Sequence, residues 1–183
     1  MTFGIVLLVI VLAVLAYGVI TYNSLVRVKN RIENGWAQIE VQLKRRHDLI
    51  PNLVETVKGY AAHERGTLDA VISARGQAMG AKSVTGAAQA EAGLSGTLKS
   101  LFALGEAYPD LKANQNFLAL QEELSGTESK IAYSRQYYND EVRTYNTKTQ
   151  SFPSSLLAKR FGFGKREYFA TDEAERGPVN VKF

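Results

Sequence analysis

The chain has 183 residues, with 22 Lys and Arg against 18 Asp and Glu, and a formal net charge of +4. This mild charge argues against non-specific nucleic-acid binding, and the absence of Cys excludes disulfides, thiolate catalysis and Cys-ligated zinc. Abundant Ala, Leu, Glu, Lys, Gln and Arg with only four Pro favour an all-α chain with one domain-sized core.

Residues 3–20 form an apolar run without a charged side chain, and the first charged side chain is Arg27. About 20 such residues match a hydrocarbon core of about 30 Å, so the run predicts a membrane-spanning helix. A cleaved signal peptide is the alternative. Met1 and Thr2 supply no basic residue, and residues 17–20 make a poor cleavage site, so we expect an uncleaved anchor over 1–22.

From Leu25 onward, apolar residues recur at seven-residue spacing and predict a long amphipathic helix with coiled-coil-like packing. Pro51 should kink this helix without breaking it. Arg46 falls where an apolar residue was due, so it must snorkel, pair with a carboxylate of another helix, or face a partner. Two interleaved registers make up the stripe: Leu25, Ile32, Ile39, Leu53 and Tyr60, and Trp36, Leu43, Ile50 and Val57.

Beyond the first long helix, a helical face continues through Leu68 and Val71 towards Ala78. Five Gly residues between 76 and 96 weaken a helix there, which predicts a connection at 80–86 and a small-residue helix at 87–107. Tyr108-Pro109 predicts a turn. A last long helix at 112–151 should then pack on the first through a second seven-residue stripe, made of Phe117, Leu124, Ile131, Tyr138, Tyr145 and Phe152.

The segment after Phe152-Pro153 mixes basic and aromatic residues, a composition typical of membrane surfaces. It either lies at the membrane or covers the end of the bundle, and the tail from Ala170 should be loosely ordered. Its candidate membrane contacts are Lys159, Arg160, Phe161, Phe163, Lys165 and Arg166.

Three runs resemble the LemA family of bacterial proteins: WAQIEVQLKRRHDLIPNLVETVKGYAAHE from Trp36, residues 101–146, and FPSS from Phe152. The resemblance covers about 22–169. It implies an N-terminal membrane anchor, here at the bacterial plasma (inner) membrane, and an all-α, four-helix, up-and-down antiparallel bundle. It implies no established catalytic activity and no catalytic residues.

The expected organisation is therefore a transmembrane anchor at 1–22, a helical bundle at 23–153 and a basic and aromatic segment with the tail at 154–183. Arg27, Lys29 and Arg31 favour a cytoplasmic bundle by the positive-inside rule. Similar proteins instead carry an acylated Cys before a Tyr-Asn corresponding to Tyr22-Asn23, which would hold the bundle outside the cytoplasm. This chain has no Cys, and the side of the bundle stays open.

The sequence contains no complete metal-binding, phosphate-binding or catalytic motif. His47 and His63 are 16 residues apart and lack zinc-protease or di-iron spacing, although Glu122, Glu123, Asp140 and Glu141 could approach the first helix. Residues 162–165 lack the P-loop spacing, and there is no G-x-S-x-G elbow. We therefore expect no cofactor, no metal and no small-molecule substrate.

Two groups are candidate partner contacts: Arg45, Arg46 and His47 beside Pro51, and Tyr133 and Tyr137, which lie off the second stripe. For the basic group, the alternative is a solvated face with one core arginine satisfied by Glu122, Glu123 or Glu128.

The sequence favours a membrane-anchored, non-enzymatic scaffold or adaptor that assembles with itself or with another membrane-associated protein. The alternatives are a membrane-bound hydrolase or metal-dependent enzyme, and a lipid-binding or membrane-remodelling module that uses 156–169.

Overall fold

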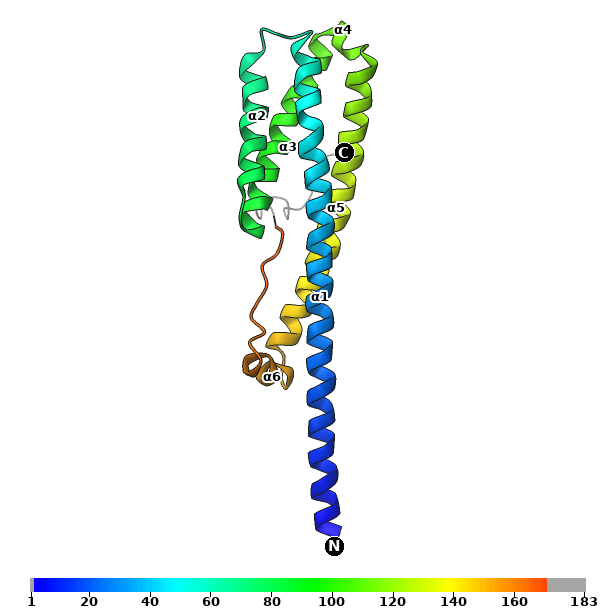
Figure 1. The fold of residues 1–183 in the computed structure, drawn as a ribbon, viewed down its shortest axis with the longest axis vertical. Helices are drawn as coiled ribbons and strands as arrows, with labels where there is room; N and C mark the ends of the chain where they lie inside the picture. The colour runs from blue at the N-terminus through cyan, green and yellow to red at the C-terminus, as the bar shows by residue number, and fades with distance from the viewer. Residues whose placement is uncertain (1, 171–183) are drawn as a thin grey trace, which may run out of the picture. The chain divides into compact units, whose positions relative to one another are not determined.

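The computed structural model describes residues 2–170, and these residues form helices and loops without a β-strand. The predicted all-α class is confirmed (Figure 1). Of the tail that was predicted to be loosely ordered from Ala170, residues 171–183 lie outside the described residues. The helices are α1 (Thr2–Lys58), α2 (Arg65–Gly80), α3 (Val84–Ala107), α4 (Pro109–Lys112), α5 (Gln115–Gln150) and α6 (Ser154–Arg160).

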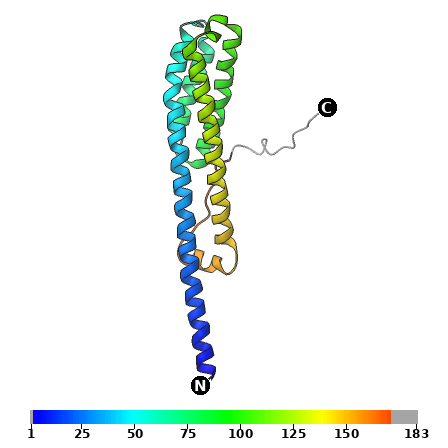
Figure 2. The same ribbon diagram turned by 90° about the vertical axis from the view of Figure 1, so that its right-hand side faces the viewer.

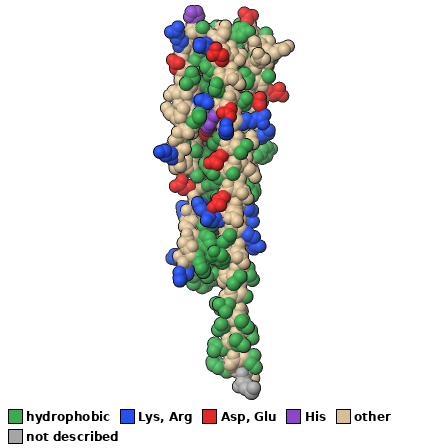
Figure 3. Space-filling view, in the orientation of Figure 1, with side chains coloured by type: hydrophobic (Ala, Val, Ile, Leu, Met, Phe, Trp, Pro, Cys, Tyr) green, Lys and Arg blue, Asp and Glu red, His purple; other side chains and the backbone are tan. Residues whose placement is uncertain are grey.

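The N-terminal stretch of α1 exposes apolar side chains on every side. Its large hydrophobic residues range from 42% exposed at Tyr17 to 82% exposed at Phe3. Figure 3 shows hydrophobic side chains along this stretch. By length and composition, α1 contains one candidate membrane span among the described residues. A surface that is apolar all round is typical of a helix surrounded by lipid.

The described residues divide into two compact units, and both α1 and α5 contribute to each. Unit 1 comprises 2–37 and 136–167, and unit 2 comprises 38–135 and 168–170.

In unit 1, α5 runs antiparallel to α1 (Figure 2). Lys148 Nζ lies 2.5 Å from Ser24 Oγ, and Arg31 Nε lies 2.9 Å from Glu141 Oε2, so residue numbers fall along α5 as they rise along α1. The interface buries one apolar face of each helix. Its buried members are Leu25, Val28 and Ile32 of α1 and Tyr138, Val142 and Tyr145 of α5.

In unit 2, α1, α2, α3, α4 and α5 all contribute to one hydrophobic core. The fully buried members are Ile50, Leu53, Val57, Val71, Leu94, Leu101 and Leu111. A close approach between α3 and α5 requires Gly105, because a Cβ built there would lie 2.9 Å from Cε1 of the buried Phe117 ring.

The helix boundaries follow local signals in the sequence. Pro51 lies inside α1 without ending it. The expected connection near 80–86 is present, and Ser83 caps α3 by accepting a hydrogen bond from the Gly86 amide at 3.0 Å. Pro109 occupies the first turn of α4, where its missing amide hydrogen costs nothing.

The two predicted stripes are buried at their first residues and in their middle, and the prediction is wrong only at the last residue of each. Ile39 is 0% exposed and Ile131 is 3% exposed. Tyr60 and Phe152, however, are 44% and 81% exposed. Both residues lie beyond their helices, since α1 ends at Lys58 and α5 ends at Gln150. A seven-residue register places a side chain on the buried face only while the helix continues.

Candidate functional site

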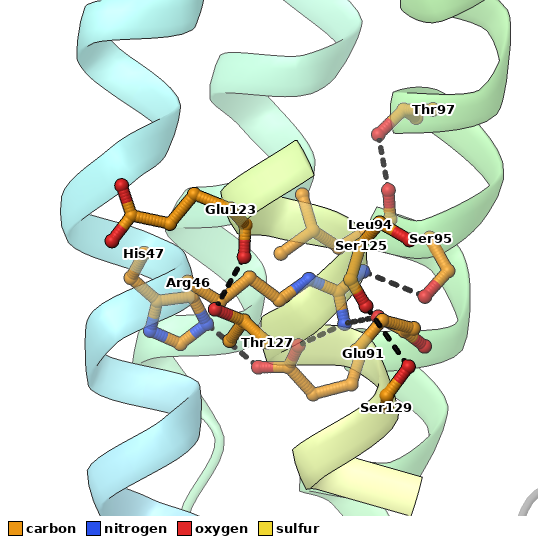
Figure 4. Close-up of polar contacts among 11 residues, drawn as sticks. Arg46, His47, Glu91, Leu94, Ser95, Thr97, Glu123, Ser125, Thr127 and Ser129 are labelled. Carbon is orange, nitrogen blue, oxygen red and sulfur yellow. Dashed lines mark hydrogen bonds and ion pairs between the residues drawn. The ribbon is translucent and has the colours of Figure 1, made fainter. Parts of the chain in front are cut away.

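A cluster of charged and polar side chains lies inside unit 2 (Figure 4). Arg46 and His47 come from α1, Glu91 and Ser95 from α3, and Glu128 from α5. Arg46 is 3% exposed and Glu91 is 5% exposed, whereas the Glu128 side chain is 52% exposed. We call these five residues the buried polar cluster.

Arg46 is the centre of the cluster. Its Nη1 donates to Glu91 Oε2 at 3.2 Å and lies 3.0 Å from Glu128 Oε2, and its Nη2 donates to Ser95 Oγ at 2.6 Å. The other carboxylate oxygen of Glu91, Oε1, lies 2.6 Å from His47 Nε2. Three helices are therefore connected through a single guanidinium and its carboxylate partners.

The cluster satisfies a charge that would otherwise be costly to bury. Moving an unpaired ion into a protein interior costs several kcal/mol, and a paired ion keeps that cost small only when further hydrogen bonds complete its shell. Glu128, Ser95 and Glu91 supply those interactions to Arg46. In addition, Arg75 Nε of α2 donates to the backbone oxygen of His47 at 2.7 Å, so α2 also contacts this level of unit 2.

The contacts of the cluster are those of a structural network. Ser95 Oγ accepts a hydrogen bond from Arg46, and His47 is bound to Glu91, so the serine and histidine do not form a nucleophile and base pair among the described contacts. Within residues 2–170, no group of three or more His, Asp or Glu side chains converges as a metal site requires. His63 lies exposed in the loop after α1, away from the cluster.

A groove of about 700 Å³ adjoins the cluster and follows α3 and α5. Arg46, Glu91 and Glu128 are among its lining residues. Small side chains on both helices leave the space open. They are Ala88, Ala92, Ser95 and Gly96 of α3 and Ser125, Ser129 and Ala132 of α5.

The predicted partner contacts are found in two environments. Arg46 and His47 are buried, 3% and 8% exposed, and their polar atoms are bound inside unit 2, which favours the alternative of a core arginine satisfied by carboxylates over a partner surface. Arg45 faces outward and pairs with Glu123, with its Nη2 2.5 Å from Oε1. Tyr133 and Tyr137 are 76% and 40% exposed, as their positions off the stripe predicted.

A core arginine paired with a carboxylate was one interpretation of Arg46 from the sequence, and this pairing is present. The sequence interpretation also named Glu128 as one of three possible partners. It missed Glu91 and Ser95. A signal was present: Glu91 is the only acidic residue between 84 and 105, a stretch of mostly small and apolar residues. A lone carboxylate in such a helix points to a buried cation nearby.

The predicted membrane contacts lie in unit 1, where α6 and the following segment return to α1. The Phe161 and Phe163 rings lie 5.0 Å and 5.7 Å from the Tyr22 ring, measured between centroids, and Phe163 also contacts Tyr145 at 6.5 Å. Phe161 stays 54% exposed and Phe163 is half-buried. The charged members are Lys159, Arg160 and Lys165, which are exposed, and Arg166, which is half-buried.

The fold and its sites define an all-helical protein with one candidate membrane span and no recognised catalytic arrangement among its described residues. A model of the LemA family matches residues 35–183, so the chain belongs to the LemA family. This confirms the resemblance found in the sequence.

Similar curated proteins support the assignment. Protein LemA of Metamycoplasma hominis is 26% identical over 160 residues, which cover 87% of this chain and 73% of that protein. Magnetosome protein MamQ 2 of Paramagnetospirillum magneticum is 25% identical over 198 residues, covering 92% and 72%. Magnetosome protein MamQ of Magnetospirillum gryphiswaldense is 25% identical over 187 residues, covering 86% and 68%. The exposed apolar helix and the MamQ relatives are consistent with membrane association.

Proposed function

We propose that this protein is a single-pass, membrane-anchored helical scaffold of the bacterial plasma (inner) membrane and that it has no enzymatic activity of its own. The observation that carries the proposal is the division of α1 into two kinds of surface. Its first stretch is apolar and exposed all round, and its later residues bury one stripe, with Ile39, Ile50 and Leu53 at 0% exposure. One helix therefore joins a lipid-compatible segment to a protein core.

The buried polar cluster supports a structural role for unit 2. Its Arg, His and Glu side chains bind one another, and this leaves no nucleophile next to a base among the described contacts. We further propose that α1, α2, α3 and α5 form a four-helix, up-and-down antiparallel arrangement. The common hydrophobic core of these helices supports this arrangement.

The scaffold would act by assembling with further copies of itself or with another membrane-associated protein. Two features of unit 2 support self-assembly: the groove of about 700 Å³ along α3 and α5, and large side chains that remain exposed. Exposed apolar and aromatic side chains are enriched at protein interfaces. The exposed large side chains among the described residues of unit 2 are Val41, Tyr60, Ile72, Met79, Leu118, Tyr133 and Tyr168.

Two measurements on native membranes test this function. We expect the full chain to stay with the membrane pellet after alkaline carbonate washing, because about 20 apolar residues hold it in lipid. Lysine-directed crosslinking of the same membranes should yield dimers and larger species of the chain. Release of the protein by carbonate would overturn the anchor, and crosslinking that yields only monomer would overturn the scaffold.

A further inference from the structure

The C-terminal part of unit 1 lies at the level where α1 leaves the apolar run. Ile20 ends that run, and Tyr22, two residues later, contacts the Phe161 and Phe163 rings. At ~1.5 Å per residue, Tyr22 lies only about 3 Å farther along the helix axis. The headgroup layer on each side of the hydrocarbon core is about 5–8 Å thick. With Ile20 at the hydrocarbon boundary, Tyr22 and the Phe161 and Phe163 rings that contact it would lie at the level of the headgroup layer.

This level of unit 1 is strongly basic. Residues 1–32 contain three Lys and Arg and no acidic residue, and residues 142–166 contain six Lys and Arg and no acidic residue. Several of these cations have partners inside unit 1, such as Arg31 with Glu141 and Arg143 with Asp140. No ion pair to any residue in 2–170 engages the side chains of Arg27, Lys159, Arg160 and Lys165.

A cavity of about 290 Å³ gives part of this charge a concave shape. Lys29, Tyr145 and residues 162–166 line it, so Lys29, Lys165 and Arg166 converge on one space. The turn that closes it requires Gly162, whose φ of 73° is unfavourable for residues with a Cβ. Glu33 forms ion pairs with two of these cations, at 3.8 Å from Lys29 Nζ and 4.0 Å from Arg166 Nη2. Such long, exposed pairs are weak.

Apolar side chains accompany the charges. Phe152, Leu156 and Phe161 are 81%, 61% and 54% exposed, and they flank or belong to α6, which also contains Lys159 and Arg160. Apolar side chains next to Lys and Arg are typical of segments that lie in a membrane interface. In water, more than half of the surface of each of these three side chains would stay exposed.

We propose that residues 152–166, together with Arg27 and Lys29, bind anionic phospholipid headgroups of the membrane that α1 crosses. We call these residues the juxtamembrane collar. The apolar side chains enter the acyl boundary, and the cations contact phosphate groups, with the cavity beside Lys29 holding one of them. The inference goes beyond the scaffold function and rests on its membrane anchor. Charge complementarity and continuity with the span select lipid as the occupant.

Electron paramagnetic resonance of spin-labelled lipids tests the proposal on the full chain. The protein is reconstituted in phosphatidylcholine vesicles that contain trace spin-labelled phosphatidylglycerol or phosphatidylcholine. We expect the fraction of spin-labelled lipid in contact with the protein to favour phosphatidylglycerol over phosphatidylcholine about three- to ten-fold. A cation near an anionic surface contributes about 1 kcal/mol, and 1.4 kcal/mol corresponds to a ten-fold change in affinity. A variant with Lys159→Gln, Arg160→Gln and Lys165→Gln should bring the preference close to one.

A matched control removes three exposed lysines of unit 2 by Lys44→Gln, Lys58→Gln and Lys112→Gln, whose side chains are 77%, 62% and 57% exposed. This control should keep the wild-type preference. Equal contact with both lipids in the wild type, or a preference that the collar variant retains, would overturn the proposal. Loss of the preference when inorganic phosphate is added at equal ionic strength would instead identify a site for free phosphate. Retention of the protein in carbonate-washed vesicles separates these outcomes from failure of the anchor.

Depth measurement gives a second, independent test. The chain has no Cys, so Leu156→Cys creates a unique position for a spin label. We expect this label in vesicles to be relaxed by lipid-soluble oxygen more than by an aqueous nickel complex. A label at Tyr133→Cys, 76% exposed in unit 2, should show the opposite order. A water-like response at Leu156→Cys would overturn the contact of the collar with lipid.

Discussion

Unit 2 contains eleven Lys and Arg and eleven Asp and Glu among its described residues, whereas unit 1 contains nine Lys and Arg and four Asp and Glu. The formal charges are therefore zero and +5. In unit 2, one arginine is buried and bound by carboxylates of two helices. Among the described residues of unit 1, no Lys or Arg is buried, and nine cations face only four acidic residues.

This difference separates charges that serve the fold from charges that are available to a partner. A buried guanidinium that is bound by carboxylates of two helices connects those helices and offers less charge to a partner. Exposed cations without acidic neighbours contribute little to stability and attract an anionic surface. The predictions below compare a buried ion pair, a buried tyrosine and an exposed ion pair.

The largest expected effect follows Glu91→Leu in unit 2. Arg46 would then keep only Glu128 and Ser95, and His47 would lose its partner, although both side chains remain buried. We expect the free energy of unfolding to fall by about 3–5 kcal/mol. Urea unfolding of the full chain in detergent, followed by circular dichroism, measures it.

The double variant Glu91→Leu with Arg46→Met distinguishes two reasons why Glu91→Leu would be destabilising. Either Arg46 is left buried without its partner, or the ion pair itself stabilises unit 2. Replacing a buried ion pair by apolar side chains of similar size is often neutral or stabilising. We expect the double variant to regain most of the stability that Glu91→Leu loses. A cost below about 1 kcal/mol for the single variant would contradict a buried, structural role for the cluster.

Among the described residues of unit 1, the buried titratable side chains are tyrosines, which are uncharged at neutral pH. Burial raises the pKa of Tyr138 and of Tyr145 above the usual value of 10.0. The folded state therefore favours the neutral phenols, and their contribution is complete below about pH 10 and is lost as the pH rises through the folded pKa. Tyr138 Oη also donates to the backbone oxygen of Glu167 at 3.0 Å.

We expect Tyr138→Phe to cost about 0.5–1.5 kcal/mol at neutral pH, because one hydrogen bond is lost. The same variant should lose less stability than the wild type between neutral and alkaline pH, since one raised pKa has been removed. Thermal unfolding across this pH range gives both quantities. As a control, Tyr133→Phe at an exposed position of unit 2 should change neither the stability at neutral pH nor the stability lost at alkaline pH. If Tyr138→Phe and the wild type lost equal stability between neutral and alkaline pH, the role of Tyr138 would be contradicted.

Sequence periodicity predicted the helices because a seven-residue spacing places residues on one face wherever the helix is continuous. Ile39 and Ile131 were placed correctly for this reason, and Tyr60 and Phe152 were not because their helices end before them. The apolar stretch before Ile20 was equally visible, since a helix in lipid needs no pattern beyond length and absence of charge.

The site was only partly predictable. Arg46 was recognisable as an apolar position filled by a cation, but its partners depend on the rotation of α3, whose Gly- and Ala-rich sequence carries little periodicity. The basic character of the collar was visible in 159–166. Its full extent was not, because it combines that segment with Arg27 and Lys29 through the pairing of α1 with α5 and the return of the chain to Tyr22.

The smallest effect is expected at Arg45, the sequence neighbour of Arg46. Arg45 Nη2 lies 2.5 Å from Glu123 Oε1, a shorter distance than any in the Arg46 pairs, yet the two side chains are 49% and 41% exposed. Water and salt screen such a pair, so we expect Arg45→Met to change the free energy of unfolding by at most about 1 kcal/mol. A double-mutant cycle with Glu123→Gln measures the coupling, which should shrink further in high salt. A coupling above about 2 kcal/mol would show that distance, and not burial, decides which arginine stabilises unit 2.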